Sequence, residues 1–445
     1  MDFEKLSELI EQKKYIEFMK ELDEINAVDA AEFLNYVDPE ILPKVFRLLK
    51  KATAAEIFPE LNPDLQETII RAITDTEISK LVDELFIDDT IDMLEELPAS
   101  VVSRVLKASS PQTRAEINRF LNYPPESTGG VMTSEFLSIH ANMTVSEAVD
   151  RIRRTGYEKE TIYVIYVTDK SRVLKGFLEL RDLIFSPQDE LIENIMDTSI
   201  ISAQTLDTKE TAASLISKYD LLALPVVDKE ERLVGIVTVD DAMDVIEEAA
   251  TEDIEMMAAI SPTDKPYLKT GVFETWKKRI PWLLLLLISA MFTGSIITHY
   301  EEALGSMVIL TAFIPMLMGT GGNAGGQASV TIIRGLSLGE IRMGNILKII
   351  WKEFRISLLC GITLSAVIFA KAMLIDRTTL TSALVVSISL LLTVIIAKFV
   401  GCSLPILAKR IGFDPAVMAS PFITTIVDAV SLLIYFQIAS HALGI

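Results

Sequence analysis

Apolar positions along residues 1–120 recur every three or four residues, as in amphipathic helices. Three stretches repeat this pattern: FLNYVDPEILPKVFRLL, EIFPELNPDLQETIIRAI and LVDELFIDDTIDMLEELP. The first two contain an Asp-Pro-Glu or Asn-Pro-Asp corner, and because proline is tolerated in the first helical turn, these corners predict helix starts. Repeated short helices predict an all-α superhelical N-domain over residues 1–125.

The pattern then changes from helical spacing to strand-like runs. Residues 161–167 (TIYVIYV) and 221–228 (LLALPVVD) are β-branched, aromatic and leucine-rich, which predicts buried strands. Residues 175–184 and 234–246 each indicate a strand that turns into a helix through an acidic residue. The order helix, strand, strand, helix therefore occurs twice. The two α/β domains are predicted at residues 126–190 and 191–250.

The last third of the chain is predominantly apolar. An acidic segment at 246–260 and a break at 261–266 come first, so a connecting helix is predicted within residues 251–279. A five-helix membrane domain is predicted at 280–445. Its apolar segments, each long enough to span a bilayer, lie near 281–300, 306–333, 354–375, 380–404 and 416–440. The fold class is thus multidomain: a helical N-domain, an α/β pair, a connecting helix and a transmembrane domain.

Charges at the membrane segments predict an orientation. Lys277, Lys278 and Arg279 lie between two tryptophans before the first segment, and the loops at 334–355 and 405–415 are basic. The other two loops hold Glu301 with Glu302, and Asp376 with Arg377. The positive-inside rule therefore predicts cytoplasmic N-terminal domains and an extracytoplasmic C-terminus. The protein is expected in the plasma membrane.

Composition narrows the class of protein. Residues 1–270 hold 28 Lys and Arg against 54 Asp and Glu, whereas residues 271–445 hold 13 against 8. The acidic excess argues against nucleic-acid binding, which needs a basic surface, although solubility alone explains much of it. The N-terminus lacks an apolar core of signal-peptide length, so no cleaved signal is expected. Two cysteines and three histidines are scattered, which predicts neither a disulfide framework nor a zinc site.

Asp428 lies in the middle of the apolar stretch SPFITTIVDAVSLLIYF. Pro421, Thr424, Ser431 and Tyr435 share its helical face, at steps of three or four residues. Serine and threonine alone would fit a helix–helix seam. A carboxylate at membrane depth is costly, so this face favours an ion path.

A second polar face lies in IPMLMGTGGNAGGQASVTIIRG, residues 314–335. Thr320, Asn323, Gln327 and Thr331 share it, and five glycines surround it. Glycine lets backbones approach closely or lets carbonyls face a cavity, so both helix packing and a pore wall are open interpretations. Together the two faces suit hydrated Mg²⁺, which keeps most of its waters and needs few carboxylates. A second copy of the chain would double the negative charge.

Residues 126–250 resemble a pair of CBS domains. The resemblance rests on MTSEFLSIHANMTVSEAVDRI, on MDTSIISAQTLDTKETAASLI, and on the Gly-x-x-x-x-x-Asp turn that follows each. Such pairs commonly bind adenine nucleotides or ions, which implies ATP as a ligand. The resemblance implies nucleotide-binding roles for Thr238 and Asp182.

The whole chain resembles the MgtE family of magnesium channels, through its domain order and the motifs GTGGNAGGQA and FITTIVDAVSLLIYF. The resemblance implies a homodimer with Asp428 as the carboxylate that holds hydrated Mg²⁺ in the pore. The pore-lining residues it implies are Gly319, Asn323, Gln327, Pro421, Thr424 and Thr425. It also implies a gate closed by regulatory Mg²⁺ at Asp88, Asp89, Asp220, Asp241, Asp244, Glu252 and Asp253.

The predicted function is a Mg²⁺-selective channel driven by the electrochemical gradient and closed by cytoplasmic Mg²⁺. Two alternatives stay open: a broader path that admits Mn²⁺, Co²⁺ or Ca²⁺, and a membrane-anchored CBS nucleotide sensor. Membrane helices that only anchor a CBS pair need no Asp at membrane depth, so the presence of Asp428 counts against the sensor. No nucleophile–base pair and no phosphate-binding P-loop is visible, so an enzyme is not expected.

Overall fold

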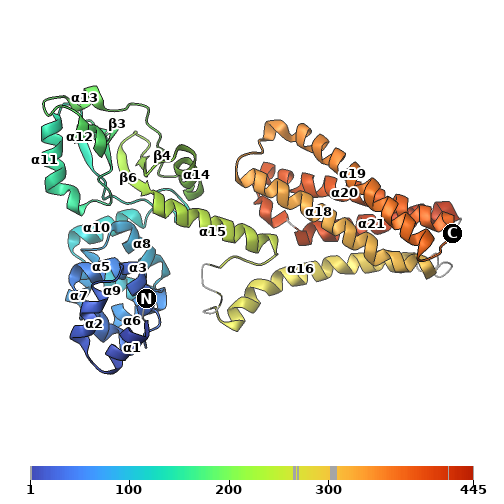
Figure 1. The fold of residues 1–445 in the computed structure, drawn as a ribbon, viewed down its shortest axis with the longest axis horizontal. Helices are drawn as coiled ribbons and strands as arrows, with labels where there is room; N and C mark the ends of the chain where they lie inside the picture. Colours follow the sequence, from blue (N-terminus) through green and yellow to red (C-terminus); the bar gives the residue numbers. More distant parts are fainter. Residues whose placement is uncertain (1–2, 264–266, 268–269, 301–307, 419, 444–445) are drawn as a thin grey trace. The chain divides into compact units, whose positions relative to one another are not determined.

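The computed structural model describes residues 3–263, 267, 270–300, 308–418 and 420–443. The chain forms two compact units, an N-terminal unit of residues 1–246 and a C-terminal unit of residues 247–445 (Figure 1). Each unit is described by itself. Parts of the predicted break at 261–266, of the predicted segment at 306–333 and of the loop with Glu301 and Glu302 lie outside the described residues.

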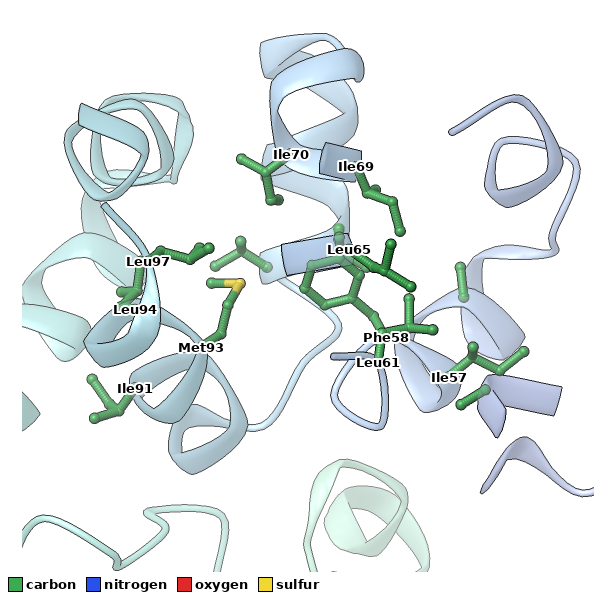
Figure 2. Packing of buried hydrophobic residues seen from close by; sticks show 14 of the residues in the cluster. Ile57, Phe58, Leu61, Leu65, Ile69, Ile70, Ile91, Met93, Leu94 and Leu97 are labelled. Carbon is green, nitrogen blue, oxygen red and sulfur yellow. The ribbon is translucent and has the colours of Figure 1, made fainter. Parts of the chain in front are cut away.

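The N-terminal unit begins with short helices that stack in two rows. Even-numbered helices from α4 to α10 pack on one another, as do odd-numbered helices from α3 to α9. Apolar side chains from α5, α6 and α8 fill the layer between them, including Phe58, Leu65 and Met93 (Figure 2). The helices are α1 (Phe3–Glu11), α2 (Tyr15–Leu22), α3 (Ala27–Leu34), α4 (Leu42–Phe46), α5 (Lys51–Ile57), α6 (Pro63–Ala72), α7 (Asp75–Val82), α8 (Ile87–Glu96), α9 (Ala99–Ala108) and α10 (Pro111–Phe120).

The two proline corners behave differently. Pro63 is the first residue of α6, as the sequence predicts. At the first corner the helix starts later, at Leu42, with Pro43 in its first turn. The Asp38 side chain accepts a hydrogen bond from the Glu40 amide (2.9 Å), and this local turn competes with helix.

Two three-stranded sheets confirm the predicted duplication. In each, the first strand pairs parallel and the third antiparallel with the middle strand, in the orders β1-β2-β3 and β4-β5-β6. The first half comprises β1 (Ser138–His140), α11 (Val145–Thr155), η1 (Gly156–Glu158), β2 (Val164–Thr168), β3 (Leu174–Glu179) and α12 (Leu180–Phe185). The second comprises α13 (Ile192–Ile195), β4 (Ala203–Gln204), α14 (Lys209–Tyr219), β5 (Ala223–Val227), β6 (Leu233–Thr238) and α15 (Val239–Met257).

The connecting helix predicted over residues 251–279 is not one helix: its acidic part lies in α15, which ends at Met257, and the next long helix begins at Val272. Helix α15 begins at Val239, directly after β6, and continues to Met257 without a break. The acidic segment is therefore a continuation of the last helix of the second α/β half.

Long helices dominate the C-terminal unit. They are α16 (Val272–His299), η2 (Val308–Phe313), α18 (Ile314–Ser337), η3 (Met343–Asn345), α19 (Ile346–Leu374), α20 (Leu380–Ile411), η4 (Pro415–Met418) and α21 (Ser420–Leu443). In the described residues, four helical spans are long and apolar enough to cross a membrane: 272–299, 346–374, 380–411 and 415–442. The glycine-rich α18 is not among them, since its small and polar residues lower its hydropathy. It starts at Ile314 rather than near 306, with Pro315 in its first turn.

Candidate functional site

Helix α18 packs against α20 and α21, and its glycines permit the close approach (Figure 1). A Cβ placed on Gly321 would lie 2.7 Å from Thr393 of α20, and one on Gly322 would lie 2.8 Å from Thr424 of α21. Gly401 of α20 meets the backbone of Gly325 directly. These glycines therefore serve helix packing, one of the two interpretations that the sequence left open.

The other side of α18 is polar, and most of it lines a cavity that α19 and α20 also border. Gly319, Asn323 and Gln327 are exposed at successive steps of four residues, and a Cβ on Gly319 would meet nothing within 4 Å. Thr331 continues this row and donates to the Gln327 carbonyl (2.8 Å). We call Gly319, Asn323, Gln327 and Thr331 the polar face of α18. Such a face at membrane depth requires water or protein beside it.

The first two turns of α21 gather oxygen atoms. The hydroxyls of Thr424 and Thr425 both donate to the Pro421 carbonyl, at 2.8 and 3.1 Å. With their protons used in this way, the threonine oxygens keep lone pairs that can accept hydrogen bonds from water. Asp428, one turn further on, is half-buried, and its carboxylate has no hydrogen-bond or ion-pair partner in the described part of the chain.

The predicted polar face of α21 does not stay accessible along its length. Ser431 and Tyr435 are buried in the bundle, and the Tyr435 hydroxyl donates to the Leu310 carbonyl (2.9 Å). The accessible part of the face is therefore confined to the N-terminal half of α21. Since Gly322 contacts Thr424, this half of α21 packs against α18.

Sequence reasoning missed two charged residues in the C-terminal unit. Glu353 of α19 is 8% exposed and Lys398 of α20 is 5% exposed. Lys398 was visible as a charge inside the apolar run TVIIAKFVG, whereas Glu353 stands among basic residues at the start of its helix. Both line a cavity beside α18.

In the N-terminal unit, residues distant in sequence form an acidic cluster of Asp88, Asp89, Glu160 and Asp241. Asp88 and Asp89 begin α8, Asp241 is in the first turn of α15, and Glu160 precedes β2. One oxygen each of Asp88 and Glu160 is buried without a hydrogen-bond partner among the described residues. The structure brings the Asp88/Asp89 pair and Asp241 together, and their role as Mg²⁺ ligands stays a prediction. Glu160 was missed because only the fold brings it there.

The cluster is electrostatically strained. Burial, and then the negative charge of Asp241, raise the pKa of Asp88 well above its usual range. The same two causes raise the pKa of Asp89 to about 6 and that of Glu160 to about 7. Burial also raises the pKa of Asp241, although a hydrogen bond from Thr238 opposes the shift. Carboxylates crowded in this way favour binding of protons or cations.

The remaining predicted acidic residues lie apart from the cluster. Asp220 is exposed and ends α14 in the left-handed conformation (φ 52°). Asp244 and Glu252 are exposed on α15. In the part of the chain that the structure describes, no group of three or more His, Cys, Asp or Glu side chains is arranged to hold a metal ion directly. Any Mg²⁺ here would keep waters between itself and most carboxylates.

Asp253, near the end of α15, contacts α18 within the C-terminal unit. It accepts a hydrogen bond from Ser337, the last residue of α18 (3.1 Å). Burial raises its pKa, and the negative charge of Asp414 adds to the shift. Met256 and Met257 pack on Ile333 and on Ala416 nearby. The end of α15 therefore docks against the end of α18.

The predicted nucleotide residues both cap helices. Thr238 donates from its hydroxyl to Asp241 (2.5 Å) at the start of α15, and Asp182 accepts from the Glu179 amide (2.8 Å) at the start of α12. Their nucleotide roles stay a prediction.

Comparisons with known proteins cover nearly the whole chain. The "Magnesium transporter MgtE" of Thermus thermophilus is 36% identical over 422 residues, which are 94% of this chain and 93% of that protein. The chain belongs to the MgtE family. The protein of the same name from Bacillus subtilis is 34% identical over 97% of this chain and 95% of its own length. The family resemblance found in the sequence is confirmed.

Family profiles and solved structures match successive parts of the chain. The profile "MgtE intracellular N domain" matches residues 25–126, the CBS domain profile matches 129–188 and 192–248, and the MgtE profile "Divalent cation transporter" matches 314–438. A solved soluble part of a magnesium transporter is 32% identical, with a TM-score of 0.53, and covers 56% of this chain and 98% of that one. A cytosolic domain of the Mg²⁺ channel MgtE in complex with ATP is 36% identical, with a TM-score of 0.52, and covers 54% and 98%. MgtE proteins are membrane transporters, not enzymes.

Proposed function

We propose that the chain is a Mg²⁺ channel of the plasma membrane that conducts the hydrated ion down its electrochemical gradient. The observation that carries the proposal is the unpartnered Asp428 carboxylate, one turn from two threonine oxygens on a helix that packs against α18. A carboxylate supplies charge, and threonine and amide oxygens hold water, which suits an ion that dehydrates reluctantly. The relatives named magnesium transporters support the choice of ion.

The working unit is proposed to be a homodimer with a central pore. A single Asp428 neutralises half the charge of Mg²⁺, whereas two copies facing one another neutralise it fully. The exposed polar face of α18 supports this arrangement, because lipid cannot satisfy amide side chains and a second copy with a water-filled path can. Five membrane helices, α16 and α18 to α21, with cytoplasmic N-terminal domains and an external C-terminus, complete the proposal.

The acidic cluster is proposed to act as the sensor of a gate. Bringing Asp88, Asp89, Glu160 and Asp241 together is unfavourable while they are ionised, and Mg²⁺ offsets their repulsion. Asp220, Asp244, Glu252 and Asp253 are proposed as further regulatory ligands. Because the end of α15 docks on the end of α18, the state of the acidic helix bears directly on a pore helix.

We also propose that the CBS pair binds an adenine nucleotide through Thr238 and Asp182. The support is the complex of a related cytosolic domain with ATP. Isothermal titration of the full chain with ATP tests this proposal. Thr238→Val and Asp182→Asn should each weaken binding, and unchanged affinity in both variants would refute the assignment.

The channel is tested by Mg²⁺ flux into liposomes that contain the full chain. Asp428→Asn should lower the flux by about tenfold or more, because the loss of the ionised carboxylate weakens the interaction with the hydrated ion by at least ~1.5 kcal/mol. Asp376→Asn is the matched control, because Asp376 lies in the loop after α19 and pairs with Lys371 at the end of that helix. Equal flux from wild type and Asp428→Asn would refute the pore assignment. A panel with Mn²⁺, Co²⁺ and Ca²⁺ distinguishes a selective channel from the broader divalent path.

A further inference from the structure

A cavity of about 830 Å³ lies between α18, α19 and α20 in the C-terminal unit. Two of its lining side chains are charged and almost completely buried: Glu353 of α19 and Lys398 of α20. A third charged residue, Lys352, lies at its edge, and Asn323, Gln327 and Thr331 of the polar face of α18 form another wall. Charged and amide side chains thus line part of this cavity, although it is built from membrane helices.

The two buried charges lack protein partners. One carboxylate oxygen of Glu353 is buried without a hydrogen bond. Lys398 lines the cavity, and no hydrogen bond or ion pair of its side chain is found among the described residues. Unpaired buried charges are strongly unfavourable. They therefore point to a ligand that offers an anionic group to Lys398 and a hydrogen-bond donor to Glu353.

An apolar slot of about 140 Å³ adjoins this cavity. It lies between α19 and α20, is lined by Ile350, Phe354, Ile395, Ile396 and Phe399 among others, and shares Glu353 with the larger cavity. A chamber with charged side chains that continues into an apolar slot between membrane helices fits a ligand with a charged head and a hydrocarbon chain.

We propose that this cavity binds an anionic phospholipid of the phosphatidylglycerol type. Its phosphodiester lies between Lys352 and Lys398, its glycerol hydroxyl donates to Glu353, and an acyl chain enters the apolar slot. Two ammonium groups and one carboxylate leave a net charge of +1, which a single phosphodiester neutralises. A hydrated divalent cation fits less well, because both lysines repel it. Basic pockets between membrane helices commonly bind anionic headgroups in this way.

The headgroup chemistry sets an order of preference. Phosphatidylcholine offers no hydrogen-bond donor to Glu353 and no net negative charge, so it should bind least. Phosphatidylethanolamine offers the donor but leaves the net positive charge uncompensated. Phosphatidylglycerol satisfies both requirements, so its retention over phosphatidylcholine is the signature of the site.

The test is native mass spectrometry of the full chain in detergent, with equimolar phosphatidylglycerol and phosphatidylcholine. Lys352→Gln should lower phosphatidylglycerol retention about fivefold, the effect of one basic residue on an anionic lipid. Lys398→Gln should lower it by about tenfold or more, since that lysine is buried. The matched control is Lys348→Gln, one turn earlier on α19, which is exposed and outside the cavity, and it should retain the lipid.

Lys352 is exposed, so its variant should fold even if the loss of Lys398 disturbs packing. The proposal is overturned if the wild type retains both lipids equally, or if Lys352→Gln retains phosphatidylglycerol as well as Lys348→Gln does. It is also overturned if inorganic phosphate displaces the bound lipid, because the site would then recognise a free anion. The readout is lipid retention, so the result does not depend on the proposed transport.

Discussion

At the scale of single residues, the same residue type serves opposite purposes within a few positions. Gly321, Gly322 and Gly325 give α18 its close contacts, whereas Gly319 on the opposite side touches nothing that a Cβ would meet. Likewise, Ser431 and Tyr435 are buried in the bundle, while Thr424 and Asp428 remain accessible. The local environment, rather than the motif, separates residues that pack from residues that can meet an ion.

Gly322→Ala should destabilise the protein. Its Cβ would lie 2.8 Å from the Thr424 methyl carbon, and such overpacking typically costs about 1–3 kcal/mol. Thermal unfolding of the detergent-solubilised chain measures the effect. Gly319→Ala is the control, since its Cβ meets open space, and it should be neutral or slightly stabilising because alanine favours helix. Equal melting temperatures for the two variants would contradict the packing role of Gly322.

The acidic cluster predicts an unusual pH dependence for the metal-free protein. Asp89 and Glu160 have pKa values raised to about 6 and about 7, so the folded state holds protons that the unfolded state has already lost. Their contribution to stability is full below the unfolded pKa values and is lost as pH rises through the folded ones. In chelator, protease resistance of the N-terminal unit should therefore fall between about pH 5 and about pH 8.

Glu160→Gln should flatten this profile, because the amide does not titrate. Glu158→Gln is the matched control: Glu158 is exposed in the same loop and should leave the profile unchanged. A profile that is as steep in Glu160→Gln as in the wild type would exclude the cluster as its cause.

At the scale of elements, the contact between α15 and α18 matters most, because it would couple the proposed Mg²⁺ sensor to the proposed pore. The hydrogen bond from Ser337 to Asp253 and the packing of Met256 and Met257 on Ile333 hold their ends together. Asp414 lies close enough to raise the pKa of Asp253, so this junction also collects negative charge. A cation bound there would strengthen the contact between a proposed sensor helix and a proposed pore helix.

Ser337→Ala should make the channel harder to close. The substitution removes one exposed hydrogen bond, typically about 1 kcal/mol, so the internal Mg²⁺ needed for half-closure should rise by about fivefold at most. Liposome flux at graded internal Mg²⁺ gives this value. Ser295→Ala, which removes only a bond to the Met291 carbonyl within α16, is the matched control. A closure curve identical to that of the wild type would exclude this bond from gating.

Secondary structure could be predicted well where one periodicity dominates. The strands β2, β3, β5 and β6 and the repeated α/β order follow from apolar runs. The start of α18 could not be predicted in this way, because the apolar run begins before the helix does. The continuity of α15 could not be predicted either, because no proline or glycine marks the end of the second α/β half. The acidic cluster was only half predictable, since Glu160 joins Asp88 through the fold alone.

At the scale of the whole molecule, an acidic soluble unit and an apolar helical unit share one chain, and the acidic helix α15 runs from the first into the second. Under the proposed gate, a cation bound at either end of α15 would therefore change the free energy of a helix common to both units. Coupling of this kind needs no long pathway of side chains. It needs only one helix whose position depends on what binds at each of its ends.

Mg²⁺ should protect the full chain from proteolysis, and the protection should depend on the acidic cluster. A ligand that binds only the compact state stabilises it by RT ln(1 + [L]/Kd), about 2.7 kcal/mol at one hundred times Kd. Cleavage in the N-terminal unit should therefore slow by about a hundredfold at saturating Mg²⁺.

The double variant Asp89→Asn/Asp241→Asn should be resistant without Mg²⁺ and gain little from it, because the repulsion between these carboxylates is already removed. Asp29→Asn/Asp64→Asn, acidic residues of α3 and α6, is the matched control and should still need Mg²⁺. If the cluster variant responds to Mg²⁺ as strongly as this control, the sensor lies elsewhere in the chain.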